Sequence, residues 1–209
     1  GFIGSNFAKK ANQQGLNVTI LDNLSTGSQA TVDELEQLGI KVIIGDILDQ
    51  ELLKKSLTGI SAVVHLAAQV SVPISIENPE ETIEINIKGT QNVIDSCLET
   101  NVQRLVMASS AAVYGDLNNL PLKEEDAGQG FSPYAKSKWA NEQQIIDVRK
   151  QGLQATALRF FNVYGSGQSP EGTYAAVIPK FTDLMIKGIA PTINGDGLNT
   201  RDFVHIEDV

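Results

Sequence analysis

The first 22 residues, GFIGSNFAKKANQQGLNVTILD, decide the fold. Two glycines three residues apart, Gly1 and Gly4, precede a helical pattern over 5–14, and an apolar run over 16–22 follows. Further apolar runs lie at residues 41–46, 62–68, 104–110 and 155–162, and further helical patterns at 50–57, 80–99, 133–150 and 174–187. Near-continuous apolar runs are typical of strands buried on both faces of a sheet. The alternation predicts an α/β protein with a Rossmann-like, doubly wound parallel sheet.

The chain divides near Tyr164, after which glycines and prolines become frequent. We therefore expect a dinucleotide-binding domain over residues 1–164. Residues 165–209 are expected to begin a smaller C-terminal substrate-binding region, partly interleaved with the sheet. Because the chain opens on a glycine with no strand before it and stops at Val209, we expect a fragment whose first strand is missing.

The composition excludes several classes of protein. There are 25 acidic and 16 basic side chains, a formal net charge of −9, which argues against binding to nucleic acid or to anionic lipid. Cys97 is the only cysteine, so an internal disulfide and a thiolate zinc cage are excluded, and we expect no metal site. No apolar run approaches the roughly 20 residues of a membrane span. We expect a cytoplasmic protein that does not bind membranes.

The opening glycines and Asp22 together indicate a dinucleotide site. Glycines let the backbone approach a pyrophosphate at a helix N-terminus, where free N–H groups and the helix dipole stabilise negative charge. An acidic side chain about 20 residues later accepts hydrogen bonds from the adenosine ribose. Asp22 meets that spacing from Gly4 and would repel a 2′-phosphate, so the pattern favours NAD over NADP.

The stretch SPYAKSK, residues 132–138, indicates the catalytic group. Ser132 is a good N-cap, and Tyr134 and Lys138 then lie one turn apart on the same helix face. A free phenol has a pKa of about 10. We expect the Lys138 ammonium, the helix N-terminus and a bound nicotinamide to lower it enough for Tyr134 to act as a base. Ser110, at the end of an expected strand, can align the phenol.

Nine segments place this chain beside a known family: GFIG, LDNLSTG, GDILD, VVHLAAQ, the N-x-x-GT of residues 86–90, SSAAVYG, SPYAKSK, RFFNVYG and GDGLNTRDFVHIEDV. Their order and spacing resemble the extended short-chain dehydrogenases/reductases that act on nucleotide sugars. The resemblance covers the whole chain, from Gly1 to Val209.

The resemblance implies a role for each matching residue. It implies catalysis by Ser110, Tyr134 and Lys138, of which Ser110 and Tyr134 would also bind substrate together with Asn162 and Arg201. The residues that it implies for binding the cofactor are Gly1, Phe2, Ile3, Gly4, Asp22, Asn23, Ser25, Thr26, Gly27, Asp46, Ile47, Leu66, Ala67, Ala68, Gln69, Asn86, Ser109, Tyr134, Lys138 and Phe161.

The resemblance also implies the reaction, an NAD-dependent epimerisation of a nucleotide sugar at C4 through a 4-keto intermediate. UDP-glucose and UDP-galactose are the expected substrates, with UDP-N-acetylglucosamine or UDP-glucuronate as alternatives. The family's dehydratases and decarboxylases carry acids after the serine, where this chain has Ala111 and Ala112, so those activities are disfavoured. A non-catalytic NAD-binding scaffold is the alternative from another class. The family often forms homodimers through helices that match 80–99 and 133–150.

Overall fold

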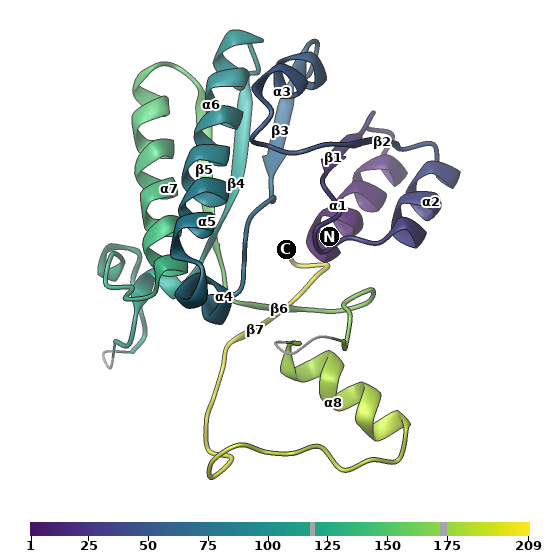
Figure 1. Cartoon of the computed structure of the whole chain (residues 1–209), viewed down its shortest axis with the longest axis vertical. Coiled ribbons are helices and arrows are strands. Elements are labelled where there is room, and N and C mark those ends of the chain that lie inside the picture. The colour runs from purple at the N-terminus through teal and green to yellow at the C-terminus, as the bar shows by residue number, and fades with distance from the viewer. Residues whose placement is uncertain (118–119, 172–174) are drawn as a thin grey trace.

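The computed structural model describes residues 1–117, 120–171 and 175–209. Helices and parallel strands alternate along it (Figure 1), which confirms the predicted α/β class. The strands are β1 (Thr19–Asp22), β2 (Lys41–Ile44), β3 (Ala62–His65), β4 (Arg104–Ser110), β5 (Gln154–Phe160), β6 (Asn162–Tyr164) and β7 (Phe203–His205). The α-helices are α1 (Phe2–Gln13), α2 (Gln29–Gln37), α3 (Gln50–Leu57), α4 (Val72–Glu77), α5 (Pro79–Ile83), α6 (Gly89–Glu99), α7 (Pro133–Lys150) and α8 (Val177–Ile186).

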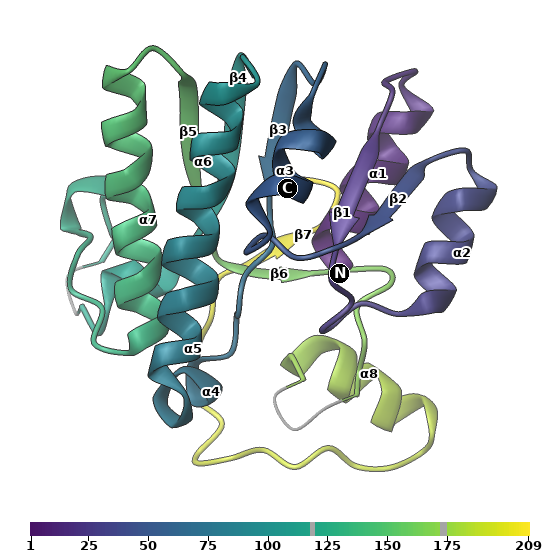
Figure 2. The same ribbon diagram turned by 45° about the horizontal axis from the view of Figure 1, so that its top comes forward.

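The strands form three parallel sheets instead of one continuous sheet. Strand β1 pairs with β2, strands β3, β4 and β5 pair in that order, and β6 pairs with β7. Among the described residues, no strand joins β1 to β3 by hydrogen bonds. The β1–β2 pair stands beside β3 in Figure 2 with its strands running alongside those of the larger sheet.

The main core lies between the β3–β4–β5 sheet and the helices α6 and α7. Alternate β4 side chains, Leu105 and Met107, pack against Ile94 of α6 and Ile145 of α7. Helix α3 packs on α6, and a smaller cluster lies between α1, α2 and the first two strands. This packing aligns the C-terminal ends of β3, β4 and β5 at one edge, beside the first turn of α7 (Figure 2).

Most predicted elements are present with shifted ends. Strand β4 and the helices α3 and α7 have the predicted bounds. The run 155–162 divides into β5 and β6. The helix predicted over 80–99 divides into α5, a π-helical turn η1 (Glu84–Lys88) and α6. Helix α8 is shorter than predicted, and Tyr174, the start predicted for it, lies outside the described residues.

Two helices were not predicted. Helix α2 is capped by Ser28, whose side chain accepts a hydrogen bond from the Thr31 backbone, and it buries only Val32 and Leu35. Helix α4 is a single short segment that follows the loop after β3. Few apolar positions and short length make both hard to see in a sequence.

Candidate active site

The first turn of α7 carries the predicted catalytic pair. The Ser132 side chain accepts a hydrogen bond of 3.0 Å from the Ala135 backbone, and Pro133 follows it, so the helix begins where predicted. Tyr134 and Lys138 are both buried, with 9% and 5% of their surface exposed. The Lys138 ammonium donates a 3.0 Å hydrogen bond to the Ala108 carbonyl of β4, so the helix is tied to the strand that carries Ser110.

Burial controls the ionisation of this pair. It lowers the pKa of Lys138 to about 8. It raises the pKa of the Tyr134 phenol above its ordinary value, and a hydrogen bond with the Ser110 side chain offsets part of that rise. Loss of hydration thus has the larger effect in the protein without cofactor. The prediction that Lys138, the helix N-terminus and a bound nicotinamide together lower this pKa stays a prediction.

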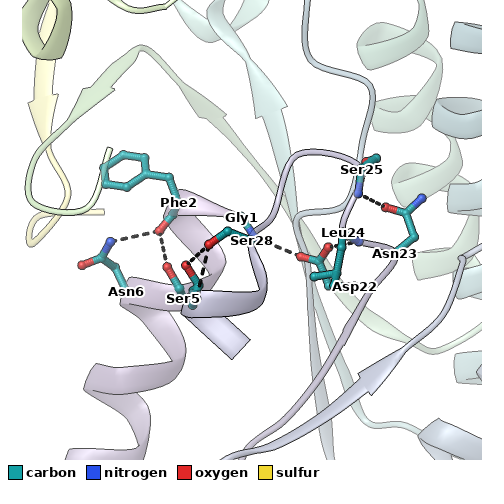
Figure 3. A network of polar contacts seen from close by, with 10 residues as sticks. Gly1, Phe2, Ser5, Asn6, Asp22, Asn23, Leu24, Ser25 and Ser28 are labelled. Atoms are coloured by element: carbon teal, nitrogen blue, oxygen red, sulfur yellow. Dashed lines mark hydrogen bonds and ion pairs between the residues drawn. The ribbon is translucent and has the colours of Figure 1, made fainter. Parts of the chain in front are cut away.

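The glycines at the start of α1, the acid that ends β1 and the residue that follows β3 lie close together. The N-terminal ammonium of Gly1 forms a 2.9 Å ion pair with the Asp22 carboxylate (Figure 3). A side chain built on Gly1 would come within 3.8 Å of the Thr26 hydroxyl, and one built on Gly4 within 3.7 Å of Leu66. Three segments that were predicted to bind one cofactor are thus neighbours.

The loop after β1 is fixed by hydrogen bonds between its side chains and its own backbone. The carboxylate of Asp22 accepts a 2.8 Å hydrogen bond from the backbone of Leu24, and the Asn23 side chain accepts one from the Ser25 backbone (Figure 3). The Asn23 amide also donates to Asp46 at 2.8 Å. The loops predicted for the adenosine ribose and for adenine are therefore joined.

Gly27, in that loop, packs closely against Leu24. A Cβ on Gly27 would lie 3.1 Å from a Leu24 methyl group and 3.5 Å from a carboxylate oxygen of Asp22. A Cβ at this position would press on the Leu24 methyl group and meet Asp22 at an ordinary contact distance.

Asn86 holds the loop after β3. Its carboxamide accepts a 2.8 Å hydrogen bond from the Gln69 backbone N–H and donates to the Gln69 carbonyl at 3.0 Å. It also donates to the Ser137 hydroxyl, which donates to the Tyr134 carbonyl. Asn86 is 1% exposed and both of its N–H groups donate within the protein, so it positions the loop after β3. Its contact with a cofactor stays a prediction.

The π-helical turn η1 contains Asn86, and side chains of α7 bond its backbone. The Asn141 amide donates to the Asn86 carbonyl at 2.8 Å, and the Gln144 amide donates to the Ile87 carbonyl at 3.1 Å. π-Helical turns are rare and often occur at functional sites. Sequence reasoning missed these residues, although polar side chains at 137, 141 and 144 on an otherwise packed helix were the available signal.

Two predicted cofactor residues point into the protein. Ser109 is 3% exposed, and its hydroxyl donates to Glu142. The Ile47 side chain packs in the main core, where a Cβ on Gly89 would come within 2.5 Å of it. In β4 the alternation turns the Ser109 side chain toward α7. Ile47 lies after β2, with its side chain in the core, and the cofactor contacts expected of both residues stay predictions.

The predicted substrate residues lie on β6 and the segment before β7. The Asn162 amide donates to the Asp202 carbonyl at 2.9 Å, and Arg201, next to it, is exposed. Phe161 packs near Tyr114, with ring centres 6.2 Å apart. The remaining predicted residues are Phe2 and Ile3, at the start of α1, and Ala67 and Ala68, in the loop after β3.

His65, at the end of β3, has a structural setting. Its Nε2 lies 2.9 Å from the Thr90 hydroxyl, and both side chains are buried. Burial, together with the nearby Lys138 ammonium, lowers the pKa of His65 to about 3, so the ring is neutral at physiological pH. His65 is therefore a hydrogen-bonded, neutral histidine at the end of a strand.

The described residues fit a dinucleotide at the sheet edge. Gly1 precedes α1 without a capping side chain, so the first amides of that helix are available to an anion. The buried Gln69 side-chain oxygen, in the loop after β3, has no hydrogen-bond partner in the structure. A buried carbonyl oxygen without a donor is costly, and the carboxamide of a nicotinamide is a donor of the right kind.

Other kinds of site find no support in the described part of the chain. Across residues 1–117, 120–171 and 175–209 no three acidic, histidine or cysteine side chains cluster as metal ligands would. Over the same residues, no helix has both the length and the apolar character that crossing a membrane requires.

Comparisons with known proteins agree with this geometry. The family described as "NAD dependent epimerase/dehydratase family" matches residues 1–209. The UDP-N-acetylglucosamine 4-epimerase of Methanobrevibacter ruminantium M1, solved with UDP-N-acetylmuramic acid, is 37% identical with a TM-score of 0.94. The UDP-glucose 4-epimerase of Thermotoga maritima, solved with UDP-glucose, is 33% identical with a TM-score of 0.92. Both comparisons cover all of this chain and 67% of the other.

UDP-glucuronate 4-epimerase 4 of Arabidopsis thaliana is 35% identical over 222 residues, which is all of this chain and 50% of that protein. The chain thus spans between half and about two thirds of the length of these relatives. The three relatives carry the names of three different sugars.

Proposed function

Since this chain belongs to the NAD-dependent epimerase/dehydratase family, we propose that it holds NAD and epimerises a UDP-sugar at C4, interconverting UDP-glucose and UDP-galactose through a 4-keto sugar. One observation carries the proposal: Tyr134, Lys138 and Ser110 meet where α7 crosses the end of β4. The residues after Ser110 are Ala111 and Ala112, which offer no carboxylate for an elimination.

The cofactor residues would divide the work along the dinucleotide. The N-terminus of α1, with Gly1 and Gly4, would hold the pyrophosphate, and Asp22 the adenosine ribose. Gln69 and Lys138 would lie at the nicotinamide end. When bound, NAD would accept a hydride from the sugar and return it to the opposite face of the 4-keto sugar.

Tyr134 acts as the proton acceptor for the sugar 4-hydroxyl. Its buried phenol needs stabilisation of the ionised form, and Ser110 supplies part of it by hydrogen bonding. The Lys138 ammonium, fixed by the Ala108 carbonyl, lies one helical turn from the phenol. When the reaction reverses on the other face of the sugar, Tyr134 returns the proton.

The substrate is proposed to bind between the C-terminal edge of the sheet and residues 165–209. Asn162 and Arg201 would contact its nucleotide part. Arginine suits a diphosphate because its guanidinium can bind two oxygens at once. UDP-N-acetylglucosamine and UDP-glucuronate are the alternatives, and the relatives named above favour keeping both in the assay. Dehydration and decarboxylation are less favoured because of Ala111 and Ala112.

A homodimer is proposed through α5 and α7. Each helix exposes a large apolar side chain, Ile83 at 51% and Ile146 at 47%. Light scattering after gel filtration should give twice the chain mass, and Ile83→Glu with Ile146→Glu should give the single mass. A monomeric unaltered protein would refute the dimer.

The test of the reaction is to incubate the purified protein with UDP-glucose, UDP-galactose, UDP-N-acetylglucosamine and UDP-glucuronate and to identify products by NMR. We expect the C4 epimer of the true substrate, and conversion of UDP-galactose at the highest kcat/KM. Lys138→Met should abolish turnover, whereas Lys136→Met, two residues away and exposed, should not. Bound NAD without turnover on any of these sugars would support a non-catalytic scaffold instead.

A further inference from the structure

A charged pair joins β5 to α7 beside the strand that carries Ser110. The Arg159 guanidinium of β5 donates two hydrogen bonds to the Glu142 carboxylate of α7, at 2.9 and 2.8 Å. Glu142 is 7% exposed, and it raises the pKa of Arg159. The same carboxylate accepts a hydrogen bond from the Ser109 hydroxyl of β4.

The other N–H groups of Arg159 extend this pair to the loops after β4. One guanidinium nitrogen donates to the Tyr114 hydroxyl at 3.0 Å and to the Glu124 carbonyl at 2.7 Å, and the guanidinium lies 5.0 Å from the centre of the Tyr114 ring. A buried ion pair is weak support for stability, because desolvation offsets most of its attraction. A fully bonded pair does fix the relative position of every segment that it touches.

Helix α7 and β4 are joined in register at three successive strand residues. Lys138 donates to the Ala108 carbonyl and Glu142 accepts from the Ser109 hydroxyl. The Ser110 side chain lies close enough to the Tyr134 phenol to lower its pKa. The three helix residues are spaced by four, so they share one helix face. Successive strand side chains point to opposite faces, so anchoring the Ser109 side chain also sets the direction of its neighbour.

We propose that Glu142 and Arg159 are positioning residues: through Ser109 they hold the end of β4 against α7, so that the Ser110 hydroxyl stays within hydrogen-bonding reach of the Tyr134 phenol. The proposal rests on the function proposed above for its kinetic consequence only. The pair acts on β4 through a hydrogen bond, because the Glu142 carboxylate accepts from the Ser109 hydroxyl.

The test compares Glu142→Gln, Arg159→Lys and Ser109→Ala with the control Asp147→Asn. The control removes the exposed Asp147–Lys150 ion pair from the same helix. Tyr134 ionisation is followed by NMR of tyrosine labelled with carbon-13 at Cζ, with each signal assigned by adding Tyr134→Phe. This readout does not depend on turnover.

We expect the Tyr134 pKa to rise by about one pH unit in Glu142→Gln, as in Ser110→Ala, because the same hydrogen bond is lost. Combining the two changes should add nothing further. In the active enzyme kcat should fall about 10²-fold with KM for the UDP-sugar nearly unchanged, the size expected for a misplaced group. Arg159→Lys should be intermediate, since an ammonium cannot bridge both carboxylate oxygens.

A Tyr134 pKa in Ser109→Ala equal to that in Asp147→Asn would overturn the proposal. Ser109→Ala leaves the ion pair intact, so it decides the question even where Glu142→Gln fails to fold. If the unaltered protein turns over no nucleotide sugar, the proposed function fails, and the NMR titration still decides whether the pair positions Ser110.

Discussion

Helix α7 buries eight of its side chains, four of them polar or charged apart from Tyr134, whereas α8 buries none of its ten. Ile206 is the only apolar side chain in the described part of 165–209 that is buried. Around α7 the side chains of Lys138, Glu142 and Asn141 are hydrogen-bonded to β4, to β5 or to the π-helical turn η1. Around α8 large apolar side chains such as Ile186 and Leu198 are exposed, at 81% and 79%.

The difference shows which part of this chain holds its side chains in fixed positions. Proton transfer needs atoms fixed within a few tenths of an ångström, and the core between β4, α6 and α7 fixes them. A region with few buried apolar contacts opens at a low free-energy cost. The catalytic residues therefore lie in the most tightly packed part of this chain.

Hydrogen exchange should show the largest contrast. Backbone amides of α7 should exchange only through global unfolding, at about 5 kcal/mol or more, and those of α8 through local opening near zero. Mass spectrometry of exchanged peptides measures both. Equal protection of α7 and α8 would break the comparison.

Acid should destabilise the folded protein through His65, at the end of β3. The pKa of His65 is about 3 in the folded protein against 6.5 for an ordinary histidine, so the unfolded chain binds more protons between these values. Stability is therefore present above pH 6.5 and is lost as pH falls toward 3, by up to about 5 kcal/mol. Urea unfolding at successive pH values measures the slope, and His65→Gln should reduce it while the surface change Lys136→Gln should not.

Truncation of one side chain in each region should give a smaller contrast. Leu105→Ala, at a site that is 1% exposed, should lower the free energy of unfolding by about 2–5 kcal/mol. Ile186→Ala should change it by less than about 0.5 kcal/mol. Chemical denaturation of both variants decides, and a cost for Ile186→Ala comparable to that for Leu105→Ala would show that α8 has a core of its own.

The sequence predicts most of the α7 region because local signals agree there. Ser132 and Pro133 mark the start of α7, and β4 is an unbroken apolar run, so Tyr134, Lys138 and Ser110 could be placed together from their positions alone. Ser109 was predicted beside the cofactor, and the alternation that Leu105 and Met107 define turns its side chain toward α7.

Other features have no local signal. The π-helical turn around Asn86 differs from an α-helix by one residue per turn, and only the amides of Asn141 and Gln144 on α7 make it stable. The pKa of Tyr134 depends on burial that no spacing reveals. Arg159 in an apolar strand was a visible anomaly, but its partner Glu142 became clear only from the fold.

The central claim is that Tyr134 moves the proton that accompanies hydride transfer. Its most direct test is the absorbance at 340 nm of the NAD-loaded protein mixed rapidly with UDP-galactose, for the unaltered protein and for Tyr134→Phe with equal NAD content. We predict a transient rise in the unaltered protein and a rate reduced by about 10²–10⁴-fold in the variant. An unchanged rate in Tyr134→Phe would contradict the account.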